Sequence, residues 1–229
     1  MSASRPQCDP DWRPKAIVFD LLTALMNSWD LWDDCTPSKT ADEGRRWRER
    51  YLQITFGTGA YVPYENLVKQ AAQEVGLPPS APEALLRQWG DLPAWPEARI
   101  VLRTLRKKGY KLGVITNCSK SLGHLAARGV EKSASDSGGG EGFRFDAVIT
   151  AEESGYYKPV KEAYEAILPV IGLEVEDVLF VAGSAGDVQG ATDAGLKVVW
   201  HNKIGMAKKG EAVPLKEAQS LHEVLKEFM

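Results

Sequence analysis

The side chains with the clearest capacity for chemistry follow short apolar runs of the chain. Asp20 closes the run at 16–19, which predicts a buried parallel strand. An acid at the carboxyl end of such a strand lies where open α/β sheets build their sites. Residues 21–25 are Leu-Leu-Thr-Ala-Leu, so no second acid follows closely in the sequence. The pattern predicts a carboxylate nucleophile that works without a metal ion.

Further polar side chains follow later apolar runs. They are Thr116 and Asn117 after the run at 111–115, Lys158 after the run at 147–149, and Ser184 and Asp187 after the run at 178–181. Because the carboxyl ends of parallel strands meet at one edge of a sheet, we expect these side chains to converge on Asp20. A cationic Lys158 near two carboxylates would keep Asp20 ionised at neutral pH, while Thr116 and Asn117 would orient groups through neutral hydrogen bonds.

Plainer interpretations of the same residues stay open. Lys158 could be a surface lysine, although a Lys-Pro pair that opens a helix at a strand end argues against it. Asp187 could only cap the helix that follows, and Asn117 could be a turn residue.

The apolar runs alternate with helical stretches, and a fifth run at 197–200 ends the series. This order predicts right-handed βαβ crossovers and an α/β fold with a Rossmann-like parallel sheet, covered on both faces. The gap between the first two runs is too long for one crossover helix. We therefore predict an inserted helical cap subdomain at 26–95, with the core domain formed by 1–25 and 96–229.

The insertion contains five of the seven tryptophans of the chain. Within it, a helical pattern at 44–56 includes Trp47 and Tyr51 with arginines between them. Most of these arginines are expected on a solvated face, although one could face the site. Outside the insertion, the Ser/Gly-rich stretch at 131–142 predicts a flexible surface loop.

The composition narrows the classes of partner. A chain of 229 residues with a net charge of −3 gives no sign of binding nucleic acid or an anionic membrane, so we expect a small-molecule substrate. No segment reaches the roughly 18 apolar residues of a membrane span, and the polar stretch at 1–14 does not look like a secretory signal, which predicts a cytoplasmic protein. Three widely spaced cysteines argue against a disulfide framework and a zinc site, and no cofactor is expected.

Taken in order, Asp20, Thr116-Asn117, Lys158-Pro159 and the stretch 183–187 resemble the four motifs of the haloacid dehalogenase (HAD) superfamily of hydrolases. The resemblance spans nearly the whole chain. It is greatest to the type II 2-haloacid dehalogenases, whose tryptophan-arginine helix is matched by Trp47-Arg48 followed by Tyr51-Leu52. Tyr164, six residues after Lys158, matches a tyrosine that this family keeps.

The resemblance implies a mechanism without a metal or cofactor. Asp20 would displace halide from the α-carbon of a 2-haloacid, and water would then hydrolyse the resulting ester. The implied roles are Arg48 for the leaving anion, Lys158 and Thr116 for holding carboxylates, Asp187 for activating water, and Leu52 and Tyr64 for walling the pocket. Family members often dimerise on the cap side, so exposed tryptophans would fit a homodimer.

Several positions depart from the family pattern. Leu22 replaces an aromatic residue, Ala24 replaces a threonine while Thr23 stands one place early, Ser184 replaces an asparagine that would contact halide or orient water, and Gly186 replaces a tryptophan. Because Leu22 and Gly186 are smaller than the aromatic residue and the tryptophan that they replace, the resemblance implies a roomier pocket.

Three alternatives follow from these departures. The scaffold could act on a non-halogenated, biosynthetic substrate, or it could bind a ligand without catalysis. A magnesium-dependent phosphatase is disfavoured, because that class has an aspartate where Leu22 stands and an acid where Gly183 stands.

Overall fold

Near-continuous apolar runs form all but the last strand of one parallel sheet, as expected where helices cover both faces. The computed structural model describes residues 12–135 and 142–229. Its sheet has the order β3-β2-β1-β4-β5-β6, and every neighbouring pair is parallel. The strands are β1 (Ala16–Asp20), β2 (Lys111–Thr116), β3 (Ala147–Thr150), β4 (Val178–Ala182), β5 (Lys197–His201) and β6 (Lys216–Ala218).

The strand order places Asp20 at the centre of the sheet. The chain builds outward from β1 through β2 to β3, then returns to add β4, β5 and β6 on the other side. The order therefore reverses between β1 and β4, which is where doubly wound sheets form their binding crevices. The α/β fold and five strands are confirmed, whereas β6 was not predicted.

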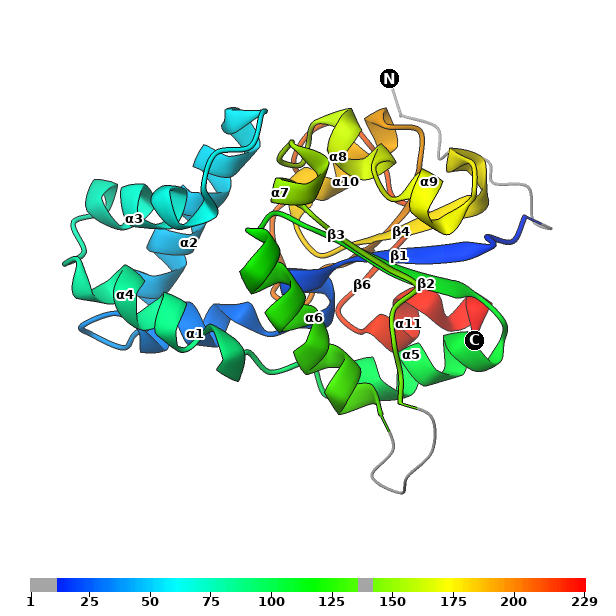
Figure 1. Ribbon diagram of the computed structural model, residues 1–229, viewed down its shortest axis with the longest axis horizontal. Helices are drawn as coiled ribbons and strands as arrows, with labels where there is room; N and C mark the ends of the chain where they lie inside the picture. Colours follow the sequence, from blue (N-terminus) through cyan, green and yellow to red (C-terminus); the bar gives the residue numbers. More distant parts are fainter. Residues whose placement is uncertain (1–11, 136–141) are drawn as a thin grey trace.

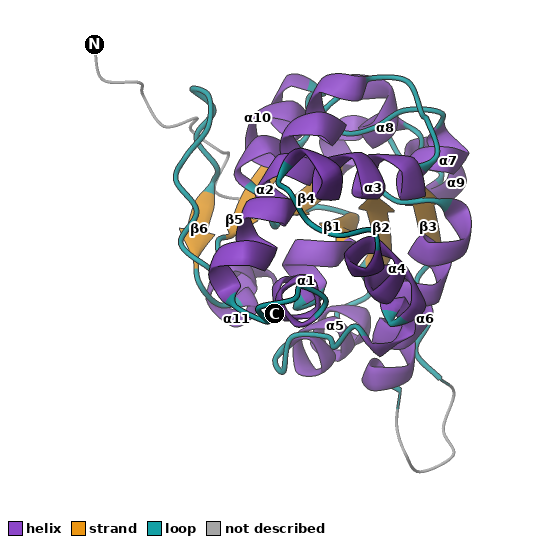
Figure 2. Ribbon diagram, turned by 90° about the vertical axis from the view of Figure 1, so that its left-hand side faces the viewer, coloured by secondary structure: helices purple, strands orange, loops and turns teal. Residues whose placement is uncertain are grey.

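Two layers of helices cover the sheet, as Figures 1 and 2 show. One layer holds α5 (Ala98–Lys107), α6 (Lys120–Ala134) and α11 (Leu221–Leu225), and the other holds α7 (Ala151–Ser154), α8 (Lys161–Glu165), α9 (Leu168–Ile171) and α10 (Ala185–Asp193). Short 3₁₀ turns lie at Val175–Asp177 and Lys226–Phe228. Alternate residues of β1 enter different apolar clusters, with Ile17 and Phe19 in one and Val18 in the other.

The segment between β1 and α5 is helical. It contains α1 (Ser28–Asp34), α2 (Ala41–Thr58), α3 (Tyr64–Glu74) and α4 (Ser80–Arg87), followed by a 3₁₀ turn at Trp89–Asp91. Figure 1 shows these helices together at one end of the molecule, beside the sheet. Helices at these positions agree with the expected insertion, while its limits as a cap subdomain, 26 and 95, stay a prediction.

The tryptophans of this segment are buried, contrary to the exposure that would have suited a dimer surface. Trp32, Trp47 and Trp89 have no exposed surface, and Trp29 and Trp95 have less than a tenth. The rings of Trp32 and Trp47 lie 4.5 Å apart, and those of Trp32 and Tyr51 lie 5.2 Å apart. These rings form the interior of the helical segment, so they offer no exposed surface for a partner.

The predicted loop at 131–142 is partly wrong. α6 continues to Ala134, so the first residues of this stretch are helical. Glu131 is buried there, accepts a hydrogen bond from the Phe145 backbone N–H, and forms an ion pair with Arg144 at 3.1 Å. Residues 136–141 of that stretch lie outside the described residues.

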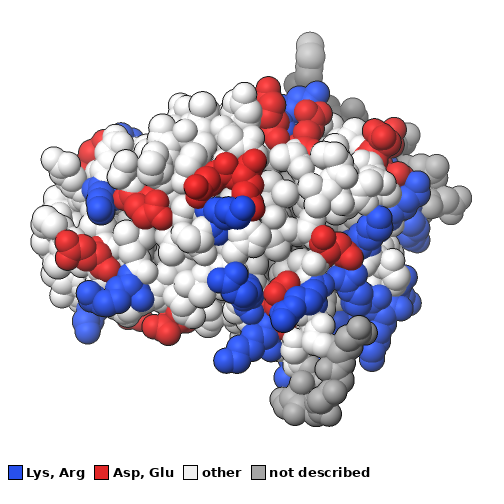
Figure 3. All heavy atoms as spheres, in the orientation of Figure 1, with Lys and Arg blue, Asp and Glu red and all other residues white. Residues whose placement is uncertain are grey.

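The surface carries mixed charge. On the face in Figure 3, acidic and basic side chains are interspersed, and Lys and Arg gather over α5. The expectation that nucleic acid is not a partner rests on net charge and stays a prediction. In 12–135 and 142–229, no helix is both long and apolar enough to cross a membrane.

Candidate active site

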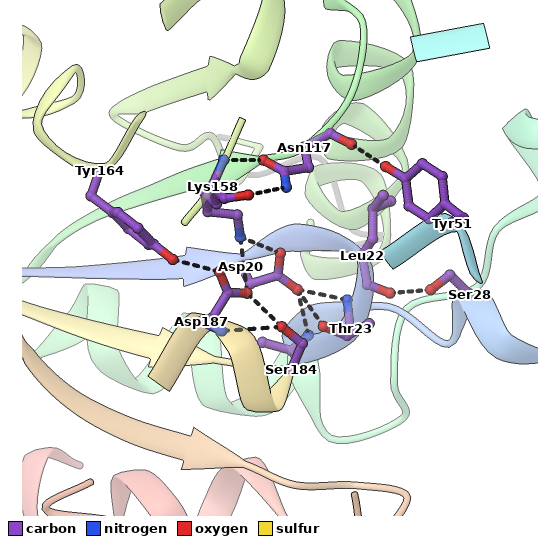
Figure 4. Close-up of polar contacts among 11 residues, drawn as sticks. Asp20, Leu22, Thr23, Ser28, Tyr51, Asn117, Lys158, Tyr164, Ser184 and Asp187 are labelled. Atoms are coloured by element: carbon purple, nitrogen blue, oxygen red, sulfur yellow. Dashed lines mark hydrogen bonds and ion pairs between the residues drawn. The ribbon is translucent and has the colours of Figure 1, made fainter. Parts of the chain in front are cut away.

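Asp20 ends β1 and begins a tight π-helical turn, η1 (Leu21–Leu25). Its Oδ2 accepts hydrogen bonds from the Thr23 amide at 2.9 Å, the Thr23 hydroxyl at 2.5 Å and the Ala24 amide at 3.3 Å. The carboxylate thus caps the turn that follows it, and only 6% of the residue is exposed. A buried carboxylate with three donors on one oxygen has a fixed orientation, as Figure 4 shows.

Lys158 joins the two acids of the site. Its Nζ lies 2.7 Å from Asp20 Oδ1 and 3.1 Å from Asp187 Oδ2, and all three side chains are buried. The Asn117 amide holds the Lys158 backbone from both sides, accepting from its N–H at 2.7 Å and donating to its carbonyl at 3.0 Å. The peptide between Lys158 and Pro159 is cis. Asn117 therefore positions the lysine across neighbouring strand ends.

Asp187 lies in the first turn of α10. Ser184 is the N-cap of this helix, and its hydroxyl donates to Asp187 Oδ2 at 3.0 Å. The Tyr164 hydroxyl donates to Asp187 Oδ1 at 2.8 Å. Both carboxylate oxygens of Asp187 are therefore hydrogen-bonded, and Asp187 both shapes the helix start and faces Lys158 (Figure 4).

The pKa values of the two carboxylates shift in opposite directions. Burial raises the pKa of Asp20, but the charge and hydrogen bond of Lys158, with the hydrogen bonds from Thr23, outweigh it and hold the pKa below its usual value. Burial raises the pKa of Asp187 above its usual value, because Lys158 offsets it only in part and the Asp20 charge adds to it. Burial lowers the pKa of Lys158, yet the two acids outweigh burial and raise it. Asp20 is thus the stronger acid of the two, and Asp187 is the stronger base.

Arg48 comes from α2 and is a buried cation with N–H groups that no described residue accepts a hydrogen bond from. Its guanidinium lies over the rings of Trp29 and Trp32, at 4.5 and 5.3 Å from their centroids. Only 2% of the residue is exposed, and Nε and Nη1 have no hydrogen-bond partner in the described part of the chain. Burial lowers its pKa, but an arginine at ordinary pH keeps its charge. A buried guanidinium with unpaired N–H groups suits an incoming anion.

These groups line one small cavity. Its walls are Asp20, Leu22, Thr23, Arg48, Tyr51, Leu52, Phe56, Asn117, Lys158, Ser184 and Asp187. The space inside that can hold solvent is about 30 Å³, room for roughly two water molecules. Asp20, Lys158, Asp187 and Arg48 were all predicted at the site, and the fold brings them to the same cavity.

Three residues expected at the site do not line this cavity. Tyr164 lies behind Asp187 and reaches it through its hydroxyl. Tyr64 lies between the rings of Tyr51 and Trp89, so it supports the aromatic interior of the helical segment. Thr116 is buried, and its hydroxyl has no partner among the described residues.

Three wall residues were not predicted at the site. Thr23 bonds Asp20, and the Tyr51 hydroxyl donates to the Asn117 carbonyl at 2.9 Å. Phe56 follows Leu52 by one helical turn of α2, a spacing visible in the sequence. The predicted roomier pocket is wrong at Gly186, because a Cβ there would meet the Phe56 ring at 2.3 Å.

The carboxylates do not fit a magnesium ion in this arrangement. The Lys158 ammonium lies between Asp20 and Asp187, and each of the four carboxylate oxygens already accepts a hydrogen bond. A Cβ at Gly183 would lie 2.3 Å from the Thr23 hydroxyl, so no acid can occupy that position without displacing the Asp20 turn. Within 12–135 and 142–229, no group of three or more His, Cys, Asp or Glu side chains could hold a metal.

Known proteins are similar to nearly the whole of this chain. Haloacetate dehalogenase H-2 of Moraxella sp. (strain B) is 28% identical over 205 residues, which cover 84% of this chain and 88% of the relative. (S)-2-haloacid dehalogenase H-109 of Pseudomonas putida is 26% identical over 225 residues, covering 92% and 96%. The crystal structure of L-2-haloacid dehalogenase RSc1362 superposes with a TM-score of 0.79 at 25% identity, covering 94% and 98%. Residues 17–201, which contain both acids and the lysine between them, match the family described as haloacid dehalogenase-like hydrolases, and the chain belongs to that family.

Proposed function

We propose that this protein is a 2-haloacid dehalogenase that works without a metal ion. The observation that carries the proposal is the pairing, in one small cavity, of Asp20, whose pKa is lowered, with a buried Arg48 whose Nε and Nη1 have no hydrogen-bond partner among the described residues. A nucleophile and an anion acceptor in the same small space suit displacement of a small leaving anion. The relatives named as haloacetate and 2-haloacid dehalogenases support this choice of substrate.

In the first step, an Asp20 oxygen attacks the α-carbon of the 2-haloacid. A carbon–oxygen bond forms, the carbon–halogen bond breaks, and its electron pair leaves with the halide. Arg48 receives this anion through its unpaired N–H groups. Lys158 and the Thr23 donors keep Asp20 ionised and oriented until it attacks. The product of this step is an ester between Asp20 and the substrate.

In the second step, water attacks the ester carbonyl of Asp20. Asp187 takes a proton from that water, in keeping with its raised pKa. The bond between the ester carbonyl carbon and the substrate oxygen breaks, that oxygen takes the proton from Asp187, and a 2-hydroxy acid leaves. The second proton of the water is released, and the Asp20 carboxylate is restored. Ser184 lies within hydrogen-bond distance of Asp187 and lines the cavity, so its hydroxyl can help to orient this water in place of an amide.

The alternatives have less support from the geometry. A non-catalytic binding site has no need of a carboxylate kept ionised by a buried lysine. A phosphatase of this superfamily would need an acid two residues after Asp20 to protonate the leaving group, and Leu22 occupies that position. A cytoplasmic location and a homodimer stay predictions.

Halide release tests the proposal. Wild-type protein should release halide from bromoacetate and (S)-2-chloropropionate in the presence of EDTA, and Asp20→Asn should not. Asp193→Asn, on the exposed part of α10, is the matched control and should act like wild type. Release that needs a divalent cation, or that survives Asp20→Asn, would refute the proposal.

A further inference from the structure

One face of α2 supplies successive walls of the cavity. Arg48, Leu52 and Phe56 are spaced by four residues, so their side chains project from the same side of the helix. Arg48 is almost fully buried, whereas Leu52 and Phe56 are half-buried. The anion acceptor therefore lies at the closed end of the cavity, and Phe56 lies nearer to solvent.

The Phe56 ring lies directly against the first turn of α10. A Cβ built on Gly186 would come within 2.3, 2.8 and 2.8 Å of three ring carbons. Most other residues would favour the helix more than glycine does. A side chain at position 186, however, could fit only if the Phe56 ring moved. This contact joins α2 to the turn that contains Ser184 and Asp187, although Phe56 and Gly186 are far apart in the sequence.

The other walls are held by their own contacts. Thr23 is bonded to Asp20, and the Tyr51 hydroxyl is bonded to the Asn117 carbonyl. The Leu22 carbonyl accepts a hydrogen bond from Ser28. Phe56 is an apolar wall whose removal would widen the cavity without breaking a hydrogen bond of the site.

The geometry of displacement at the α-carbon determines where the carboxylate and any α-alkyl group of the substrate must lie. Asp20 and the departing halide lie on opposite sides of the α-carbon, so its other substituents point sideways. The substrate carboxylate needs the polar side of the cavity, which leaves any α-alkyl group for the apolar side formed by Leu22, Leu52 and Phe56. The whole cavity has room for roughly two water molecules, so its apolar side has little space for carbon atoms.

We propose that Phe56, seated against Gly186, limits the substrate to 2-haloacids with no α-alkyl group or a very short one, so that haloacetates are preferred. This inference rests on the proposed dehalogenase function. Its readout is a ratio between two substrates, which a general loss of stability does not change.

The test compares kcat/KM for 2-chlorobutyrate and chloroacetate. Phe56→Ala should raise the 2-chlorobutyrate to chloroacetate ratio by roughly 10-fold or more, the size of effect that a methylene or two has in an apolar pocket. Phe56→Leu should raise it less. Ile54→Ala, a half-buried residue of the same helix outside the cavity, is the matched control and should leave the ratio unchanged.

A double-mutant cycle tests the contact with Gly186. Gly186→Ala should lower Tm in the wild-type background, because the ring must move, and should have little effect on Tm in the Phe56→Ala background. Equal effects in both backgrounds would show that the two residues are not coupled and would overturn the inference.

The outcomes separate the two proposals. If wild type releases halide from neither substrate, the proposed function fails. If wild type turns over chloroacetate but the ratio in Phe56→Ala is the same as in wild type, the size limit lies elsewhere and only this inference fails. If wild type already prefers 2-chlorobutyrate, the inference is also wrong.

Discussion

Replacement of Lys158 by methionine should expose how much the site depends on its central cation. Lys158 lies 2.7 Å from Asp20 and 3.1 Å from Asp187, and all three are buried, so the variant leaves two buried carboxylates without their counter-charge. Breaking a buried pair by removing one partner costs about 3–5 kcal/mol. For a chain of this size, each kcal/mol lowers Tm by roughly 2–4 °C, which predicts a fall of roughly 6–20 °C near neutral pH.

The sign of the pH dependence follows from the two carboxylates. In wild type the pKa of Asp20 is lowered, so its ion pair stabilises the fold above its unfolded pKa and is lost as pH falls through the lower folded value. In the variant, burial still raises the pKa of Asp20 and Asp187, while Lys158 no longer opposes it. Protonation then relieves the buried charge, so the variant should lose most stability near pH 8 and least near pH 4–5.

Thermal denaturation followed by circular dichroism from pH 4 to 8 measures this difference. Lys161→Met is the matched control, because Lys161 pairs with Glu165 on the surface and is largely exposed. Its Tm should follow that of wild type at every pH. A Lys158→Met variant that is as stable as this control, or equally destabilised at pH 5 and pH 8, would refute the reasoning.

Three further predictions concern single side chains of the site. Arg48→Lys, which loses the planar fork of donors, should lower the rate of halide release by roughly 10²–10³-fold in steady-state assays, whereas the exposed Arg46→Lys should not. Thr23→Val removes the hydroxyl donor at 2.5 Å and should raise the pKa of Asp20, which a shift of the acid limb of the kcat/KM profile to higher pH would show. Tyr164→Phe removes a hydrogen bond that lowers the pKa of Asp187, so rapid-quench measurements should find that the ester accumulates more at neutral pH than in wild type. An unshifted acid limb or an unchanged ester level would contradict the second or third prediction.

The convergence of the acids and the lysine could be predicted from the sequence for a simple physical reason. Buried parallel strands are nearly continuous apolar runs, so their carboxyl ends can be read directly, and parallel strands bring those ends to one edge. The edge strand β6 has the sequence Lys-Glu-Ala, which has no apolar run, and it forms only because it pairs with β5. Strands were therefore predicted correctly where burial requires apolar residues, and the strand at the edge of the sheet, β6, was missed.

The details of the cavity depend on contacts that no local pattern contains. Thr23 reaches Asp20 because the chain forms a π-helical turn directly after β1, and the spacing of a π-turn differs from that of an α-helix. Phe56 fills the space at Gly186 through a contact between two distant segments, so the size of Gly186 alone gave the wrong expectation for the pocket. Tryptophan content likewise did not predict burial, which follows from how α1 and α2 lie against each other.

The origin of the hydroxyl oxygen in the product tests the central claim most directly. One turnover with enzyme in excess over bromoacetate, in ¹⁸O-labelled water, should give glycolate without label, while mass spectrometry of the peptide that contains Asp20 finds ¹⁸O in its carboxylate. That result is predicted because Asp20 donates its own oxygen to the α-carbon and water then restores the carboxylate. Labelled glycolate together with unlabelled Asp20 would mean that water attacks the α-carbon directly, and the account of Asp20 as nucleophile would be wrong.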